Sequence, residues 1–321
     1  MGLHPVIQNA LAAARGVVPY HQLPLAEARA QARQGYPAPE QPVPVAAVRN
    51  TVIPGPDGEL AVRIYTPHGD GPYPITLFFH GSGFVLLDLD THDDICRRLC
   101  AGAATVVVSV DYRLAPEHRF PAAIDDCLAA TRWVAQNADE LAGDAARIVV
   151  AGDSAGGCLA AVTALRVRDE GGPRLLGQLL WYPVTNYPSA SNDSYREFGS
   201  GYGLTEEGMR WFWQQYLPSG SDASHAHVSP LRLESPVGLP PACVLVAEFD
   251  VLRDEGEAFA RRLAQAGIPV HARRYAGMNH GFLKYAGVLE QADAAIADAC
   301  DWLAQAFQGR AMNQRHEVLP C

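Results

Sequence analysis

The feature that most constrains the fold is an alternation of short apolar runs with helix-like segments from Ile75 onward. The runs lack the alternation of polar and apolar residues that is typical of a strand with one face exposed to solvent. They cover residues 75–80, 105–112, 147–152, 175–184, 242–250 and 270–277. Such runs are typical of strands covered on both faces, and helices between them imply right-handed crossovers in a parallel sheet. The sequence therefore predicts an α/β fold with a mostly parallel sheet of about eight strands flanked by helices.

The N-terminal part of the chain follows a different pattern. Residues 1–36 carry apolar side chains at helical spacing, and the four prolines of PAPEQPVP at 37–44 interrupt them. Two strand-like runs follow at 48–53 and 60–65, joined by the turn sequence GPDG. We expect a helical arm over residues 1–45 and then an antiparallel hairpin that opens a domain over 46–321.

A segment at about 186–235 interrupts this rhythm because it contains no strand-like run. Thr205 can cap a helix with two glutamates in its first turn, and Pro218 ends it. One face of that helix would carry the apolar side chains Met209, Phe212, Trp213 and Tyr216. Such a stripe is more often plain core, but here it lies in an insertion outside the sheet. The pattern favours a helical lid.

Composition excludes several classes of protein. Twenty-five basic and 35 acidic residues give a net charge of −10 without a basic block, which argues against a nucleic-acid partner. No run approaches 18 apolar residues, so we expect no membrane association. His4 and Pro5 stand where a signal peptide needs an unbroken apolar stretch. These observations predict a cytoplasmic protein.

The seven cysteines favour free thiols in a reducing compartment, because their number is odd and the chain is large enough to need no disulfides. Cys96 and Cys100 are four residues apart and could suggest a metal pair, as could His225 and His227. Neither pair has a second pair nearby in the sequence. We expect ordinary packing for the cysteines, no metal site and no cofactor.

A candidate nucleophile lies at the end of the run 147–152. This run continues into GDSAGG at 152–157 and then a helix-like segment, which places Ser154 in the turn between strand and helix. Glycines two residues before and two after it permit a strained turn that exposes the hydroxyl. A phosphate-binding loop is the alternative, but the segment matches neither GxGxxG nor GxxxxGK.

A serine nucleophile needs a base and a carboxylate that orients the base. His280 lies between the last strand-like run and the C-terminal helix, at the sheet edge where α/β proteins bind ligands. Asp250 ends the run 242–250, while Glu248 and Asp254 remain alternatives. The order Ser154, Asp250, His280 is that of the α/β-hydrolases.

The remaining requirement is a set of backbone N–H groups that bind the oxyanion. The run 75–80 leads into the small-residue loop His80-Gly81-Ser82-Gly83-Phe84. The predicted oxyanion hole comprises Gly81, Ser82, Gly83 and Ala155. We expect His80 to support this loop rather than act as a second base.

Together these motifs resemble the hormone-sensitive-lipase-like esterases, bacterial esterase family IV of the α/β-hydrolases. The resemblance rests on the loop at His80, on VVSVDYRLAPEH at 107–118, on GDSAGG, on DVLRDEG at 250–256 and on HGF at 280–282. It implies an α/β-hydrolase fold with a helical cap from 1–45 and 186–235. It also implies Ser154 as nucleophile, Asp250 as acid and His280 as base, and a possible homodimer.

One residue departs from the family pattern. The family loop reads HGGG, but its third position here is Ser82. A serine cannot adopt every backbone angle of a glycine, and its hydroxyl could reach the substrate. We therefore expect Ser82 to change acyl or alcohol selectivity.

The resemblance implies a cofactor-free carboxylesterase that hydrolyses small esters with short to medium acyl chains through a serine acyl-enzyme. Amides, carbamates or thioesters would use the same machinery, and some relatives of this fold are catalytically inactive receptors. The intact Ser154, Asp250 and His280 argue against a receptor. The pocket walls are predicted to include Phe84, Tyr182, Trp211, Phe212 and Phe282.

Overall fold

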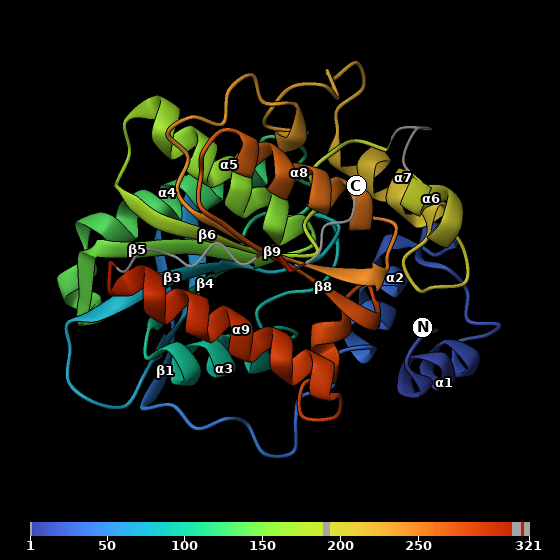
Figure 1. Cartoon of the computed structure of the whole chain (residues 1–321), viewed down its shortest axis with the longest axis horizontal. Coiled ribbons are helices and arrows are strands. Elements are labelled where there is room, and N and C mark those ends of the chain that lie inside the picture. Colours follow the sequence, from blue (N-terminus) through green and yellow to red (C-terminus); the bar gives the residue numbers. More distant parts are fainter. Residues whose placement is uncertain (1, 189–192, 310–315, 318–321) are drawn as a thin grey trace.

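A computed structural model describes residues 2–188, 193–309 and 316–317, and within them the chain forms one twisted sheet of nine strands (Figure 1). Their order across the sheet is β1-β2-β4-β3-β5-β6-β7-β8-β9. The strands are β1 (Ala47–Gly55), β2 (Gly58–Thr66), β3 (Tyr73–Phe79), β4 (Val106–Val110), β5 (Gly143–Asp153), β6 (Leu175–Trp181), β7 (Ala242–Phe249), β8 (Val270–Asn279) and β9 (His316–Glu317). β2 runs antiparallel to both β1 and β4, and every other neighbouring pair is parallel. The predicted mostly parallel sheet is confirmed, with the two-residue β9 added beside β8.

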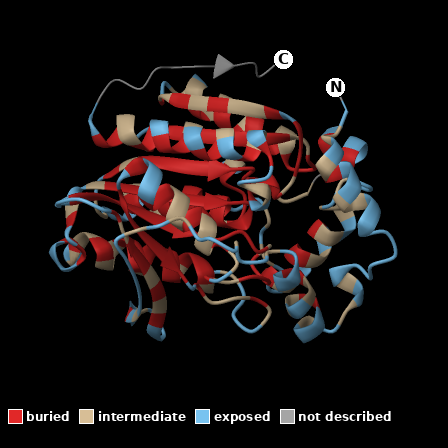
Figure 2. Cartoon of the chain, turned by 90° about the horizontal axis from the view of Figure 1, so that it is seen from below, coloured by how far each residue is buried: buried red, intermediate tan, exposed pale blue. Residues whose placement is uncertain are grey.

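Helices cover both faces of the sheet, which explains why the central strands are mostly apolar. α4 (Ala122–Gln136), α5 (Ala155–Glu170) and α8 (Arg253–Gln265) pack on one face, and α3 (Asp93–Ala103) and α9 (Glu290–Phe307) on the other (Figure 1). All residues of β3 and β4 are buried. Figure 2 shows this inner layer as continuous buried structure, with exposed residues on the outer faces of the helices.

The N-terminal hairpin forms as expected, with β1 and β2 paired from Ala47 opposite Thr66 to Gly55 opposite Gly58. At the other end of the chain, α9 packs on the sheet, and Trp302 approaches the backbone so closely that a Cβ at Gly177 would lie 2.4 Å from its ring. Val288, whose side chain is 69% exposed, does not join this contact. It precedes the helix, which begins after the buried Leu289.

Helices from two distant parts of the sequence gather at one end of the sheet (Figure 1). They are α1 (Pro5–Ala13), α2 (Leu25–Gln34), α6 (Asp193–Phe198) and α7 (Glu206–Tyr216). The α7 helix begins as predicted, since the Thr205 hydroxyl accepts a hydrogen bond from the Gly208 N–H. His21 of the turn before α2 contacts Glu207 of α7 at 3.3 Å. The first residues also reach the last long strand, because His4 N–H donates to the Gly277 carbonyl at 2.9 Å.

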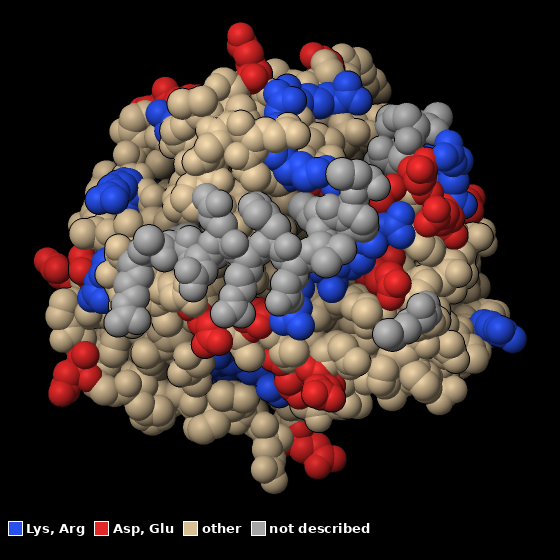
Figure 3. Space-filling model, viewed as in Figure 1, with Lys and Arg blue, Asp and Glu red and all other residues tan. Residues whose placement is uncertain are grey.

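Two features of the structure concern membranes and surface charge. In the described part of the chain, no helix combines the length and the apolar character that crossing a bilayer requires. On the face drawn in Figure 3, basic and acidic side chains are interspersed.

Cys96 and Cys100 are fully buried among apolar side chains, and burial raises the pKa of the Cys100 thiol to about 12. Cys321 lies outside the described residues.

Candidate active site

Ser154 lies in the sharp turn between β5 and α5, as predicted. Its backbone angles, φ 55° and ψ −118°, are strained for a residue with a Cβ. A Cβ at Gly152 would lie 2.3 Å from the Gly156 carbonyl oxygen, and one at Gly156 would lie 1.9 Å from the Phe79 carbonyl oxygen. Both glycines are therefore required for β5, α5 and β3 to approach this closely.

The three candidate triad residues meet at this turn. His280 Nε2 lies 2.9 Å from Ser154 Oγ, and His280 Nδ1 lies 2.7 Å from Asp250 Oδ2. The second carboxylate oxygen, Asp250 Oδ1, accepts a hydrogen bond from the Leu252 N–H at 2.9 Å. Because a carboxylate only accepts, His280 carries its proton on Nδ1 and leaves Nε2 free to accept from the serine.

The two alternative carboxylates serve other contacts. Glu248 Oε2 accepts a hydrogen bond from the Gly277 N–H at 2.7 Å. Asp254 Oδ2 accepts from the Ser194 N–H at 2.7 Å, and its Oδ1 from Arg253 at 2.8 Å. Asp250 alone of the three contacts His280 among the described residues.

The predicted oxyanion loop follows β3 and faces the turn at Ser154, but one of its N–H groups is already engaged. Gly81 N–H donates to Asp153 Oδ1 at 2.6 Å, so this part of the prediction requires correction. The N–H groups of Ser82, Gly83 and Ala155 remain candidates for the hole. None of these three donates to another residue within the described ranges.

Asp153 and His92 support this loop, and neither role was predicted from the sequence. The Asp153 side chain is buried, and His92 Nε2 lies 3.3 Å from its Oδ1. Burial opposes ionisation, but His92 and the Gly81 N–H outweigh it and lower the pKa of Asp153. His80 is fully buried, and desolvation together with His92 lowers the pKa of its imidazole to about 3. A neutral, weakly basic His80 fits the expected supporting role, and the signal for Asp153 was its place in GDSAGG.

The hydroxyl of Ser82 is bound inside the protein. Ser82 Oγ lies 2.7 Å from the Tyr112 hydroxyl and accepts from the Phe84 N–H at 2.9 Å. The Ser82 residue is only 5% exposed. The idea that this hydroxyl reaches the substrate therefore loses its structural basis.

Glu255 is a further buried carboxyl near the site, and its role was not predicted from the sequence. Its Oε1 accepts hydrogen bonds from the Thr185 N–H at 2.8 Å and the Asn186 N–H at 3.1 Å. Burial raises the pKa of Glu255 to about 8, although the two N–H groups act in the opposite direction. Glu255 thus anchors the start of the segment that leads to α6 and α7. Its sequence signal was a carboxylate within DVLRDEG.

The aromatic residues predicted to line a pocket occupy different depths. The Tyr182 ring meets His280 edge-on at 4.8 Å, and Phe282 lies fully buried behind Tyr182. Phe84 stacks on Tyr216 with ring centres 3.9 Å apart. Phe212 contacts the loop itself, since a Cβ at Gly83 would lie 2.3 Å from its ring. Trp211 is half-buried and packs edge-on against Phe212.

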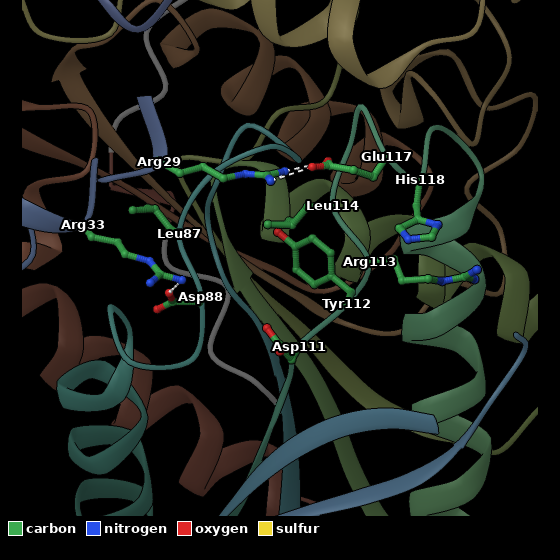
Figure 4. Close-up of a pocket in the computed structure, with 10 residues that line it drawn as sticks. All are labelled: Arg29, Arg33, Leu87, Asp88, Asp111, Tyr112, Arg113, Leu114, Glu117 and His118. Carbon is green, nitrogen blue, oxygen red and sulfur yellow. Dashed lines mark hydrogen bonds and ion pairs between the residues drawn. The ribbon is translucent and has the colours of Figure 1, made fainter. Parts of the chain in front are cut away.

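A cavity of about 420 Å³ lies between α2, the segment at Leu87 and Asp88, and the connection from β4 to α4 (Figure 4). Tyr112 lines it, whereas no triad residue does. Arg29 forms a two-pronged ion pair with Glu117 at 2.7 and 2.8 Å, and also donates to the Val85 carbonyl at 2.9 Å. The arm helix α2 is thereby fastened to the segment that follows the oxyanion loop.

Comparisons with known proteins agree with this geometry. Residues 76–284 match the family described as alpha/beta hydrolase fold. The chain is 46% identical to Esterase LipI of Mycobacterium tuberculosis, over 80% of this chain and 82% of that protein. It is 43% identical to Carboxylesterase NlhH of the same organism, over 84% and 85%.

Other relatives extend the similarity beyond this organism. The ethyl acetate hydrolase of Pseudomonas putida is 40% identical over 77% of this chain and 78% of that protein. Among solved structures, the hyperthermophilic esterase of Pyrobaculum calidifontis superimposes with a TM-score of 0.90 at 38% identity, covering 95% of this chain and 99% of that one. The chain therefore belongs to the α/β-hydrolases, within their hormone-sensitive-lipase-like group of esterases.

Proposed function

We propose that this chain is a carboxylesterase in which Ser154 is the nucleophile, His280 the general base and Asp250 the group that orients the histidine. The observation that carries the proposal is the line of contacts from Asp250 through His280 to Ser154, with steps of 2.7 and 2.9 Å. Relatives named as ester hydrolases at 40–46% identity support the ester as substrate class. The complete line of contacts supports an enzyme over a receptor.

The reaction follows from these contacts. His280 Nε2 takes the Ser154 proton while Ser154 Oγ forms a bond to the ester carbonyl carbon, and the carbonyl electron pair moves to its oxygen. Asp250 stabilises the resulting imidazolium. Collapse of the intermediate breaks the bond to the alcohol, which leaves with the proton from His280. Water then repeats these steps, releasing the carboxylic acid and restoring Ser154.

The negative oxygen of each intermediate would lie at the N–H groups of Ser82, Gly83 and Ala155. Such donors stabilise the transition state more than the substrate because charge develops on the oxygen only as the bond forms. The N-terminal position of Ala155 in α5 adds the positive end of the helix dipole.

The helices of residues 1–45 and 186–235 form the proposed cap over the domain 46–321. The contact between Phe212 of α7 and Gly83 of the oxyanion loop supports this division, as does the contact between His21 and Glu207. Aromatic side chains next to the triad, above all Tyr182, favour small esters with short to medium acyl chains. The homodimer and the cytoplasmic location remain predictions.

Steady-state hydrolysis of p-nitrophenyl esters from acetyl to dodecanoyl tests the proposal. The wild type should be most active on short chains, and Ser154→Ala should lose at least about 1,000-fold in kcat. Ser109→Ala, at a buried serine of β4, is the matched control and should keep its activity. A wild type that hydrolyses none of these esters, or a Ser154→Ala variant as active as the wild type, would overturn the assignment.

A further inference from the structure

We propose that the Ser82 hydroxyl, acting through Tyr112, is the positioning group that holds the oxyanion loop of residues 80–84 in its active shape. This inference rests on the proposed esterase function and deepens it. It starts from the one residue of the loop that departs from the family pattern. Because Ser82 acts on the loop and not on the substrate, it should affect the rate of the chemical step rather than the choice of ester.

Elementary hydrogen-bond chemistry fixes the direction of each bond in this network. The Tyr112 hydroxyl lies 2.6 Å from the His80 carbonyl oxygen, which can only accept, so the single phenol proton goes there. Ser82 Oγ, 2.7 Å from the same phenol oxygen, must then donate its proton to Tyr112. The Phe84 N–H donates to Ser82 Oγ at 2.9 Å. The relay therefore runs from Phe84 N–H through Ser82 and Tyr112 to the His80 carbonyl.

This relay joins the two ends of the loop. His80 is its first residue and Phe84 its last, and the candidate N–H donors of Ser82 and Gly83 lie between them. Gly83 and Phe84 have φ angles of 57° and 65°, and the left-handed region is strained for a bulky side chain such as Phe84. The bond to the Phe84 N–H helps to keep the backbone in this shape, together with the bond from the Ala115 N–H to the Phe84 carbonyl at 2.9 Å.

Burial makes the relay difficult to replace by water. Tyr112 is 1% and Ser82 5% exposed, and the Tyr112 ring stacks on His80 with ring centres 4.4 Å apart. Burial also raises the pKa of Tyr112 well above its ordinary value, so the phenol keeps the proton that the relay needs. Removing either hydroxyl would leave a buried polar group without its partner. The loop would then regain conformational freedom at the N–H groups that bind the oxyanion.

The predicted consequence is a selective loss of transition-state stabilisation. Misplaced oxyanion donors bind the developing charge less well but do not alter the contacts of the ester in the ground state. Loss of the relay should lower kcat while KM stays nearly constant. It should also weaken a transition-state analogue in parallel with kcat.

The experiment compares Ser82→Ala, Tyr112→Phe and the double variant with the wild type on p-nitrophenyl butyrate. Each single variant should lose about 10- to 100-fold in kcat with KM within about twofold, a smaller loss than complete removal of an oxyanion donor. The double variant should lose little more than the worse single variant, because both break the same relay. The inhibition constant of an alkyl trifluoromethyl ketone, which forms a covalent hemiketal with the nucleophile, should rise by the same factors as kcat falls.

Two controls separate a positioning role from general loss of structure. Tyr73→Phe removes a hydroxyl at the opposite end of β3, and Ser109→Ala removes a buried hydroxyl of β4. Both should keep kcat and the inhibition constant. Thermal unfolding checks that each variant folds, and if Tyr112→Phe does not, Ser82→Ala carries the test alone.

The results distinguish a failure of the proposed relay from a failure of the proposed esterase function. A wild type without esterase activity overturns both proposals. An active wild type with a Ser82→Ala variant unchanged in kcat and in ketone affinity overturns the relay alone. A Ser82→Ala variant with altered KM and unchanged kcat also overturns it, since the hydroxyl would then contact the substrate.

Discussion

Replacing Glu255 by glutamine should stabilise the folded chain at pH 8 and leave it almost unchanged at pH 5. Burial raises the pKa of Glu255 to about 8 in the folded chain, against an ordinary value of 4.5. Between these values the folded state holds a proton that the unfolded chain has lost. The contribution of Glu255 to the stability of the wild type must therefore fall as the pH rises through this window.

The size of the effect follows from the same two values. Each pKa unit corresponds to about 1.4 kcal/mol, so ionisation of this one group should remove roughly 3 to 4 kcal/mol between pH 5 and pH 8. Glutamine cannot ionise, and its carbonyl can still accept from the Thr185 and Asn186 N–H groups. The substitution should cancel this part of the pH dependence.

Urea unfolding followed by tryptophan fluorescence at pH 5, 6, 7 and 8 measures the difference. With an m value of about 3 kcal/mol/M, the midpoint of Glu255→Gln relative to the wild type should rise by about 1 M across this range. The control is Glu257→Gln on the same helix, because the Glu257 carboxylate is paired with Arg274 at 2.6 Å. That variant should be less stable than the wild type at neutral pH. Parallel pH profiles for Glu255→Gln and the wild type would refute the reasoning.

Three further predictions concern the candidate site and its proposed cap. Asp250→Asn should lower kcat by about 10,000-fold with little change in KM, because His280 loses the acceptor that fixes its tautomer. Ester hydrolysis measures the effect, and a loss of kcat below tenfold would contradict the prediction. Gly83→Ala should lower activity and stability, because the Cβ of the new alanine would lie 2.3 Å from the Phe212 ring. Adding Phe212→Ala should restore part of the activity and part of the stability. Equal losses in the single and double variants would contradict a clash. Arg29→Lys should lower the unfolding temperature by about 1 to 2 °C, the effect of losing about 1 kcal/mol in a chain of this size, because lysine cannot reproduce the two-pronged pair. An unchanged temperature in a calorimetric scan would contradict it.

The sheet and the convergence of the three candidate triad residues at one edge of it could be predicted, because each depends on short local patterns. Buried strands leave apolar runs, and the carboxyl ends of parallel strands meet at one edge, so residues that follow them converge whatever their separation in sequence. Ser154, Asp250 and His280 each follow such a run directly. The glycines around Ser154 add a local requirement that sequence shows.

The support of the oxyanion loop could not be predicted because it depends on contacts between distant segments. Gly81 N–H is engaged by Asp153, which lies 72 residues away in sequence, and Ser82 by Tyr112, 30 residues away. Nothing in the loop sequence shows which of its groups a neighbour occupies. β9 was missed because a two-residue strand contains too few residues for a period to show.

The bond from His4 to Gly277 has a consequence for how the protein matures during synthesis. Some 270 residues separate the two, and at about 5 to 20 residues per second the ribosome needs tens of seconds to deliver the second partner. During that interval α1, which carries the buried Ile7, lacks the bond that joins its N-terminal end to β8. A chain that ends before Gly277 would lack the carbonyl group that His4 binds, so α1 would be held to the sheet by one contact fewer.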